Sequence, residues 1–255
     1  SSDVCSSDLF NPLFLQEKDM VQLLQAQPAI KQYQHQVSEV HFFGAGCVSP
    51  DLREGISNAL SRVFTHAFIC VEQDILGVSY ATCGNQEGIS CILGTGSNSV
   101  YFDGQRLHPS KYGLGYILGD EGSGAYFGKQ LIKDFLYGNM PTKLYKSFSD
   151  TYQLNKERVI KKIYQEEAPC TYLGSLAPFM SSHLDSPYIQ NLLFVGFDAF
   201  IKTHVRCFDN YMHYPCHFSG SIAYHFREIL NSACQTNRIQ IEQILHRPTE
   251  KLAQF

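Results

Sequence analysis

Predicted strands and helices alternate between residues 39 and 93, and this order limits the folds open to the chain. Apolar runs suited to strands occupy 39–43, 67–71 and 89–93, and helical patterns occupy 50–63 and 75–83. In the first helical pattern, apolar residues recur at spacings of three and four: Leu52, Ile56, Leu60 and Val63. The alternation predicts an α/β fold with a mostly parallel sheet and right-handed crossovers.

The pattern changes after residue 93. Two predicted strands flank Gly94–Asn98, and Asp103-Gly104 supplies the next turn, as in a β-hairpin. A glycine-dense stretch at 113–128 then leads into a helix that Gly138 can cap. The remainder is predicted to be mainly helical to about residue 209, with a long apolar-striped helix at 188–208, a strand at 217–219, a helix to about 236 and a strand at 238–245.

Charge and composition argue against several classes of function. The 255 residues carry a formal net charge of -4 and no basic patch, so neither nucleic acid nor an anionic membrane is an expected partner. No apolar run approaches the roughly 20 residues needed to span a bilayer. The nine cysteines show no Cys-x-x-Cys pair, so we expect free thiols and no metal site built from protein ligands. A folded cytoplasmic protein is therefore expected.

The sharpest local signal is Gly94-Thr95-Gly96-Ser97-Asn98-Ser99. Glycines permit positive φ and let backbone N–H groups converge on an anion, and the side chains of Thr95, Ser97 and Asn98 add donors. This composition is typical of a phosphate-binding loop. It is not a Walker loop, because no Gly-Lys-Ser/Thr follows, and not a Rossmann fingerprint, because a strand comes next. An ordinary tight hairpin is the alternative interpretation.

A second glycine-rich segment, Gly119-Asp120-Glu121-Gly122-Ser123-Gly124, places two carboxylates at the start of a predicted helix. Helix capping would explain them, because the helix macrodipole favours negative charge there. The glycines between Gly113 and Gly124 are more numerous than a cap requires, and they would let a small polyhydroxylated ligand approach the backbone.

Two further positions lie where a predicted strand meets a helix. Asp74 is either a helix N-cap or a base that accepts a hydroxyl proton during phosphoryl transfer. Gly220-Ser221-Ile222-Ala223 is either a close-packed turn or a turn that receives adenosine or phosphate. Gly44–Gly46, Asp74 and Gly94–Asn98 each follow the carboxyl end of a predicted strand, where ligands bind in open α/β sheets.

Together these segments resemble the N-acetylglucosamine kinases within the BadF/BadG/BcrA/BcrD ATPase family. The resemblance covers essentially Asn11 to Phe255 and rests on Phe43–Cys47, Asp74, Ile92–Ser99, Gly113–Gly124 and Gly220–Ala223. It implies a two-lobed actin-like ATPase fold, related to ribonuclease H, with sugar and ATP meeting between the lobes. We place the first lobe at 10–110 and the second at 111–255, whose C-terminal segment could return to the first.

The resemblance also implies roles for individual residues. Asp74 matches the family's general base for the sugar 6-hydroxyl. The phosphate-binding positions are Gly94, Thr95, Gly96 and Ser97; the sugar-binding positions are Asn98, Asp120, Glu121 and Gly46; the adenosine-binding positions are Gly220, Ser221, Ile222 and Ala223. The implied cofactors are ATP and Mg²⁺, and the implied reaction is phosphorylation of an amino sugar, with N-acetylglucosamine as the first candidate.

The beginning of the chain departs from the family pattern. Residues 1–9 have no amphipathic period and are predicted to be a non-native leader. The family begins with a strand hairpin carrying an Asp-x-Gly-x-Thr phosphate loop, and nothing before Asn11 matches it. We therefore expect a truncated copy that lacks the first strands of lobe one and turns over ATP poorly.

Two alternative functions stay open at this point. An ATPase that activates a radical dehydratase belongs to the same family, but such activators hold an iron–sulfur cluster, and no cysteine pair here has obvious ligand spacing. A non-catalytic sugar sensor would share the fold without the chemistry. The sequence also leaves open which amino sugar is bound and whether the protein forms a homodimer.

Overall fold

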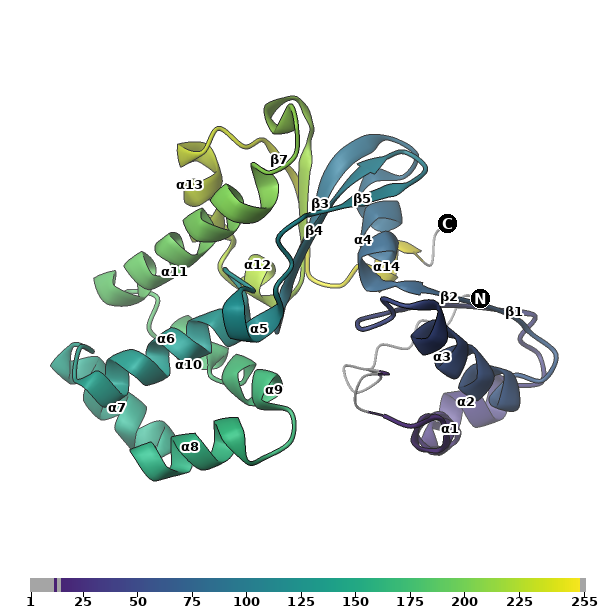
Figure 1. Cartoon of the computed structure of the whole chain (residues 1–255), viewed down its shortest axis with the longest axis horizontal. Coiled ribbons are helices and arrows are strands. Elements are labelled where there is room, and N and C mark those ends of the chain that lie inside the picture. The colour runs from purple at the N-terminus through teal and green to yellow at the C-terminus, as the bar shows by residue number, and fades with distance from the viewer. Residues whose placement is uncertain (1–11, 13–14, 253–255) are drawn as a thin grey trace. The chain divides into compact units, whose positions relative to one another are not determined.

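The computed structural model describes residues 12 and 15–252, and the chain divides into two compact units (Figure 1). Unit 1 contains the described residues up to Ala81 together with those from Thr249 onward, and unit 2 runs from Thr82 to Pro248. The predicted leader, residues 1–9, lies outside the described residues. The lobes expected at 10–110 and 111–255 stay a prediction.

Unit 1 contains a two-stranded parallel sheet and the helices that pack with it. β1 (Glu39–Gly44) pairs with β2 (Phe68–Gln73), and α3 (Pro50–Val63) connects them. The hydroxyl of Ser49 caps α3 by accepting the Leu52 N–H, and Pro50 occupies the first turn, where its missing N–H costs nothing. The predicted strand, helix and strand between 39 and 71 are therefore confirmed.

The core of unit 1 lies between α3 and the segment before β1. The apolar face of α3 packs with Met20 of α1 (Glu17–Ala26). α2 (Pro28–Tyr33) follows α1 directly, because Pro28 begins a new helix. α4 (Asp74–Cys83) begins in unit 1 immediately after β2, and α14 (Thr249–Leu252) belongs to unit 1.

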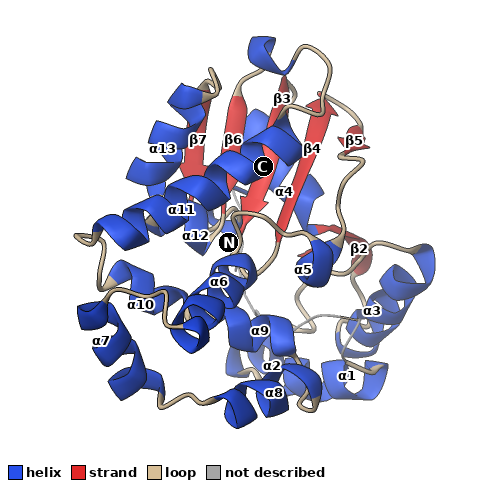
Figure 2. Cartoon of the chain, turned by 60° about the vertical axis from the view of Figure 1, so that its left-hand side comes forward, coloured by secondary structure: helices blue, strands red, loops and turns tan. Residues whose placement is uncertain are grey.

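Unit 2 is organised around a five-stranded mixed sheet in the order β5-β4-β3-β6-β7 (Figure 2). Its strands are β3 (Glu87–Leu93), β4 (Ser97–Asp103), β5 (Leu107–Pro109), β6 (Cys216–Ser219) and β7 (Ile241–Leu245). β3 and β4 form the predicted antiparallel hairpin, while β6 runs parallel to both β3 and β7. The α/β class is confirmed.

One expectation about the sheet was wrong. The alternation between 39 and 93 predicted a single, mostly parallel sheet, but among the described residues β3 is not paired with β1 or β2. Its second edge is occupied by β6, in a register that sets Ile89 opposite Cys216. An apolar run identifies a buried strand but carries no information on which distant strand will pair with it.

Helices account for most of the rest of unit 2. They are α5 (Gly115–Leu118), α6 (Gly124–Tyr137), α7 (Thr142–Tyr152), α8 (Lys156–Tyr164), α9 (Pro169–Gly174), α10 (Ala177–Ser181), α11 (Pro187–Phe200), α12 (Ser221–His225) and α13 (Arg227–Thr236). Gly138 ends α6 in the left-handed conformation, as predicted. Phenylalanines such as Phe127, Phe197 and Phe218 fill the core. No helix in the described ranges is long and apolar enough to cross a membrane.

The long helix predicted at 188–208 changes character before its end. α11 stops at Phe200 and continues as η1 (Ile201–Val205), a π-helical turn. A short 3₁₀ turn, η2 (Tyr211–His213), precedes β6. π-helical turns are rare and are found frequently at functional sites. The turn matters here because it contains His204, a buried residue of the site described next.

Candidate active site

The loop between β3 and β4 is folded against the start of α6. The carbonyl oxygens of Gly94 and Thr95 accept hydrogen bonds from the N–H groups of Gly124 and Ala125, at 2.8 and 2.9 Å. The Gly94 N–H donates to the Gly96 carbonyl oxygen at 3.0 Å, which closes the loop on itself. Backbone hydrogen bonds therefore hold the predicted phosphate loop and the second glycine-rich segment together.

The turn at Gly220 packs against the same loop. A Cβ at Gly220 would lie 2.4 Å from the Leu93 carbonyl oxygen, and Gly220 has φ +113°, a conformation that other residues rarely adopt. A Cβ at Gly124 would meet the Gly94 carbonyl oxygen at 3.4 Å and Ile222 Cδ1 at 3.6 Å. The structure thus brings Gly94–Ser97, the start of α6 and Gly220–Ala223 into one cluster.

Asp120 lies over the β3–β4 loop. Its carboxylate accepts a hydrogen bond from the Ser97 N–H, and a Cβ at Gly96 would lie 2.9 Å from Asp120 Oδ2. Burial raises the pKa of Asp120, while the Ser97 hydrogen bond and the charge of Lys129 lower it in part. The helix cap is Ser123, whose hydroxyl accepts the Tyr126 N–H at 3.1 Å. Asp120 is therefore not the helix cap, and its carboxylate contacts the β3–β4 loop instead.

The loop itself offers a mixture of satisfied and unsatisfied polar groups. The Ser97 N–H lies close enough to the Asp120 carboxylate to lower the pKa of that group. Ser97 Oγ is buried and has no hydrogen-bond partner among the described residues. A buried polar atom without a partner costs about 1–3 kcal/mol. A ligand that hydrogen-bonds to this hydroxyl would remove that cost, so the loop fits a polar, hydroxyl-bearing or anionic ligand.

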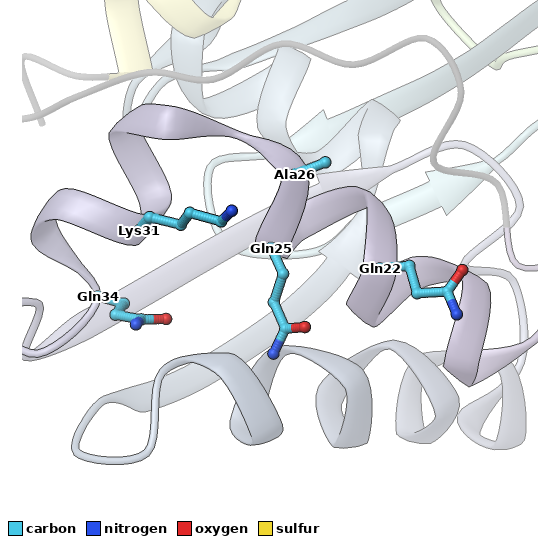
Figure 3. A pocket seen from close by; sticks show the side chains of 5 residues that line it. All are labelled: Gln22, Gln25, Ala26, Lys31 and Gln34. Carbon is cyan, nitrogen blue, oxygen red and sulfur yellow. The ribbon is translucent and has the colours of Figure 1, made fainter.

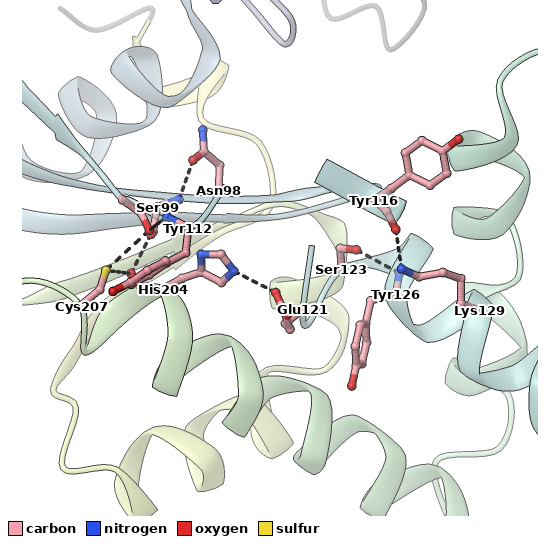
Figure 4. A network of polar contacts seen from close by, with 11 residues as sticks. Asn98, Ser99, Tyr112, Tyr116, Glu121, Ser123, Tyr126, Lys129, His204 and Cys207 are labelled. Carbon is pink, nitrogen blue, oxygen red and sulfur yellow. Dashed lines mark hydrogen bonds and ion pairs between the residues drawn. The ribbon is translucent and has the colours of Figure 1, made fainter. Parts of the chain in front are cut away.

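Glu121 is held by a histidine from a distant part of the chain. His204 Nε2 lies 2.9 Å from Glu121 Oε2, and the two side chains point toward one another (Figure 4). His204 is 2% exposed, and its carbonyl oxygen accepts a hydrogen bond from Ser99 Oγ at 2.7 Å. Sequence reasoning missed His204, because one histidine in an apolar helical pattern gives no sign of its partner.

A lysine lies on the other side of the two carboxylates. Lys129 on α6 donates hydrogen bonds to the carbonyl oxygens of Tyr116 and Ile117, which belong to α5 (Figure 4). Burial lowers the pKa of Lys129, and the charges of Asp120 and Glu121 act in the opposite direction. The positive charge thus partly balances two carboxylates that follow one another in the chain.

The remaining predicted sugar position in unit 2, Asn98, is exposed. Asn98 Oδ1 accepts the N–H of Ser99 at 2.8 Å, so its amide nitrogen faces away from that bond. Ser99 is the same residue whose hydroxyl binds the His204 carbonyl oxygen. Asn98 and Glu121 are therefore linked through Ser99 and His204.

In unit 1 the structure places Asp74 and Gly46 near one another. β1 and β2 end at the same edge, because Gly44 is the register partner of Gln73. Gly46 has φ +81° in the turn after β1, and Asp74 is the first residue of α4. Asp74 Oδ1 accepts the Ile75 N–H at 2.8 Å. Both positions therefore follow the carboxyl ends of adjacent parallel strands.

Burial determines the acid–base behaviour of this edge. The pKa of Asp74 is raised by burial, although the Ile75 N–H hydrogen bond acts against the rise. Burial, and then the charge of Asp74, raise the pKa of the Cys47 thiol to about 11. Arg53 Nη1 lies 3.5 Å from Glu72 Oε2, so Glu72 is paired with a cation. Asp74 has no such ion pair among the described residues.

The predicted site residues are thus divided between the units, with Asp74 and Gly46 in unit 1 and the others in unit 2. Across the described ranges, no three His, Cys, Asp or Glu side chains cluster as metal ligands. Mg²⁺ in kinases is held by one or two carboxylates and the substrate phosphates, so it needs no such cluster.

A surface hollow in unit 1 lies beside α1 and α2 and contains none of the predicted site residues (Figure 3). Its lining residues are Gln22, Gln25, Ala26, Lys31 and Gln34. Neutral amides predominate, and none of the lining side chains is a carboxylate that could serve as a base. The hollow is not part of the candidate site.

No family model matches the chain, and no curated protein does. Solved structures do match. A structure named a putative N-acetylglucosamine kinase from Porphyromonas gingivalis is 38% identical, with a TM-score of 0.91, covering 96% of this chain and 87% of that one. Another of the same name, from Chromobacterium violaceum, is 20% identical with a TM-score of 0.59, covering 76% of this chain and 70% of that one, and supports the fold alone. On its 38% identity over 96% of its length, the chain belongs to the sugar kinase family that the Porphyromonas gingivalis structure represents.

Proposed function

We propose that this protein transfers the γ-phosphoryl group of ATP to an amino sugar, with the 6-hydroxyl of N-acetylglucosamine as the acceptor. The observation that carries the proposal is the 38% identity, over 96% of the chain, to a structure named a putative N-acetylglucosamine kinase. Because a shared fold does not by itself fix a reaction, the side chains of the candidate site supply the second line of support. The two-lobed actin-like architecture is part of the same proposal.

Sugar recognition is assigned to the cluster in unit 2. The Asp120 carboxylate accepts hydrogen bonds, Asn98 can donate one through its amide, and Ser97 Oγ is a buried hydroxyl without a partner. Sugars present several hydroxyl groups that both donate and accept, so they suit this mixture. A partly buried carboxylate gains strength as an acceptor because less water competes for it.

Asp74 is assigned the role of general base. Its carboxylate would accept the proton of the 6-hydroxyl as that oxygen attacks the γ-phosphorus. Burial raises the pKa of Asp74, and a stronger base removes a hydroxyl proton more readily as long as it stays ionised at the working pH. Unlike Glu72, Asp74 is not paired with Arg53, so its proton affinity is not lowered by a salt bridge.

ATP is assigned to the backbone of the β3–β4 loop and to the turn after β6. A Cβ at Gly94 would meet nothing within 4 Å, and Thr95 is exposed, so phosphate oxygens can approach on that side of the loop. Asp120 covers the other side, where its charge would repel phosphate. Gly220–Ala223 would contact adenosine. Mg²⁺, carried mainly by the phosphates, would neutralise their charge.

A coupled ADP-release assay tests the proposal. The protein is supplied with ATP, Mg²⁺ and, in turn, N-acetylglucosamine, glucosamine, N-acetylmannosamine or glucose, and each sugar is also titrated by calorimetry. N-acetylglucosamine should give the highest kcat/KM. The assay is repeated with the chain extended at its N-terminus by a hairpin carrying Asp-x-Gly-x-Thr. Tight sugar binding without ADP release by the extended chain would instead favour a sensor, and release of ADP without any sugar dependence would favour an ATPase.

A further inference from the structure

The buried pair between His204 and Glu121 is not explained by core packing alone. A carboxylate and an imidazole both lose hydration when they are buried, so burial is costly for each of them unless the two are paired. His204 Nε2 donates to Glu121 Oε2 at 2.9 Å, since an ionised carboxylate can only accept. The Glu121 side chain keeps 24% exposure, whereas that of His204 keeps 3%. The open side of the pair is therefore the side of Glu121.

The geometry points to His204 as a positioning residue for sugar binding, which orients Glu121 through its ring and the Asn98–Ser99 strand through its carbonyl oxygen. This inference rests on the function proposed above. It adds a residue that is not itself assigned a contact with the sugar. His204 lies 83 positions after Glu121 in the sequence.

The π-helical turn explains how one residue can serve both partners. In η1 the backbone hydrogen bonds shift from the α-helical pattern, and the Arg206 N–H donates to the Ile201 carbonyl oxygen at 2.9 Å. The His204 carbonyl oxygen accepts from Ser99 Oγ at 2.7 Å and from Cys207 Sγ at 3.3 Å. The ring meanwhile contacts Phe200, with centroids 5.2 Å apart, which restricts its rotation.

Two properties of the site make orientation of Glu121 important. Asp120 precedes Glu121 directly, so a movement of one carboxylate disturbs the other, and the charge of Glu121 raises the pKa of Asp120. Lys129 interacts with both carboxylates and also holds α5. Without His204, Glu121 could turn toward Lys129 or Asp120, and the arrangement of acceptors offered to a sugar would change.

The test compares two substitutions at His204 with a matched control, using the full chain. The amide nitrogen of His204→Gln can reach Glu121 as Nε2 does, whereas His204→Leu cannot donate. The control is His183→Leu: His183 is another histidine of unit 2 that hydrogen-bonds a side chain, Ser147 Oγ at 3.1 Å, and contacts a phenylalanine ring, Phe179. N-acetylglucosamine affinity is measured by calorimetry and folding by thermal melting.

We expect His204→Leu to weaken N-acetylglucosamine binding about tenfold, the size of one charge-assisted hydrogen bond, and His204→Gln to stay within about threefold of the parent. His183→Leu should lower the melting temperature without changing affinity. Unchanged affinity in folded His204→Leu, or an equal loss in His183→Leu, overturns the positioning role while leaving the kinase proposal intact. No sugar binding by the parent chain rejects both.

Discussion

In unit 2 the predicted site residues are fixed mainly by backbone contacts, whereas in unit 1 the predicted base depends on the environment of one carboxylate. Gly94, Gly124 and Gly220 approach each other so closely that a side chain at Gly220 would overlap the Leu93 carbonyl oxygen. Asp74 instead begins a helix at the edge of a two-stranded sheet, and burial controls its pKa. Substitutions in unit 2 should thus act on folding and affinity, and those at Asp74 on chemistry.

The largest expected effect tests the chemical half of this comparison. Asp74→Asn should lower kcat by about a hundredfold or more with little change in sugar affinity, because general bases contribute about 10²–10⁴-fold to rate. The amide oxygen of Asn can still accept the Ile75 N–H. Steady-state ADP release together with sugar titration separates the two quantities. Near-normal kcat would remove Asp74 from the mechanism.

The next effect tests the packing half. Gly220→Ala should destabilise unit 2 by about 2–3 kcal/mol, because the new Cβ would lie 2.4 Å from a backbone oxygen and φ is +113°. Gly94→Ala is the matched control, since its Cβ would meet nothing within 4 Å and its φ is not positive. Urea unfolding of both variants is the measurement. Equal stability of the two would show that the turn relaxes easily and that packing does not fix the cluster.

A smaller effect, on sugar affinity, is expected at Asp120, whose carboxylate both contacts the β3–β4 loop and is proposed to bind the sugar. Asp120→Ala should weaken sugar binding by roughly tenfold, because a carboxylate acceptor is lost and its partners are left unpaired. Asp120→Asn keeps an acceptor for the Ser97 N–H and tolerates the observed φ of +56°, so it should lose less. Calorimetry with N-acetylglucosamine measures both. Unchanged affinity in Asp120→Ala would assign Asp120 to loop structure alone.

Whether a feature could be predicted from the sequence depends on how far apart in the chain the contacting residues lie. The β3–β4 hairpin, the cap of α3 and the end of α6 at Gly138 depend on neighbouring residues, and the sequence predicted them. The pairing of β3 with β6 depends on contacts between residues more than a hundred positions apart, and the expectation that the strands between 39 and 93 share a mostly parallel sheet was wrong. Local propensity cannot choose among distant partners.

The candidate site follows the same rule. The glycine-rich motifs identified the segments that meet in unit 2, because glycine is needed where backbones approach closely. His204 was missed, because only the tertiary fold brings the end of α11 to Glu121. Asp120 and Ser123 both suit a helix cap by residue type, and it took the geometry to assign the cap to Ser123.

The smallest expected effect is a change in melting temperature when an aspartate is replaced by asparagine. The change is expected to have opposite signs in the two units. Burial raises the pKa of Asp74 above its ordinary value of 3.8, so the folded protein binds this proton more tightly than the unfolded chain. Stability is then lost as pH rises from 3.8 through the raised folded pKa, and the loss persists at neutral pH. Asp74→Asn removes the buried charge, so at pH 7 its melting temperature should be slightly above that of the parent, a difference that vanishes below pH 3.8.

Asp198 in unit 2 provides the opposite case. Burial alone would raise its pKa, but hydrogen bonds from Asn237 and Lys202, at 2.8 and 2.6 Å, lower it overall. The ionised form therefore stabilises the fold above the ordinary value of 3.8, and this contribution disappears as pH falls through the lowered folded pKa. Asp198→Asn should accordingly melt below the parent at pH 7. If both variants shift in the same direction, the environment of Asp74 is not the desolvated one that its proposed role as a base requires.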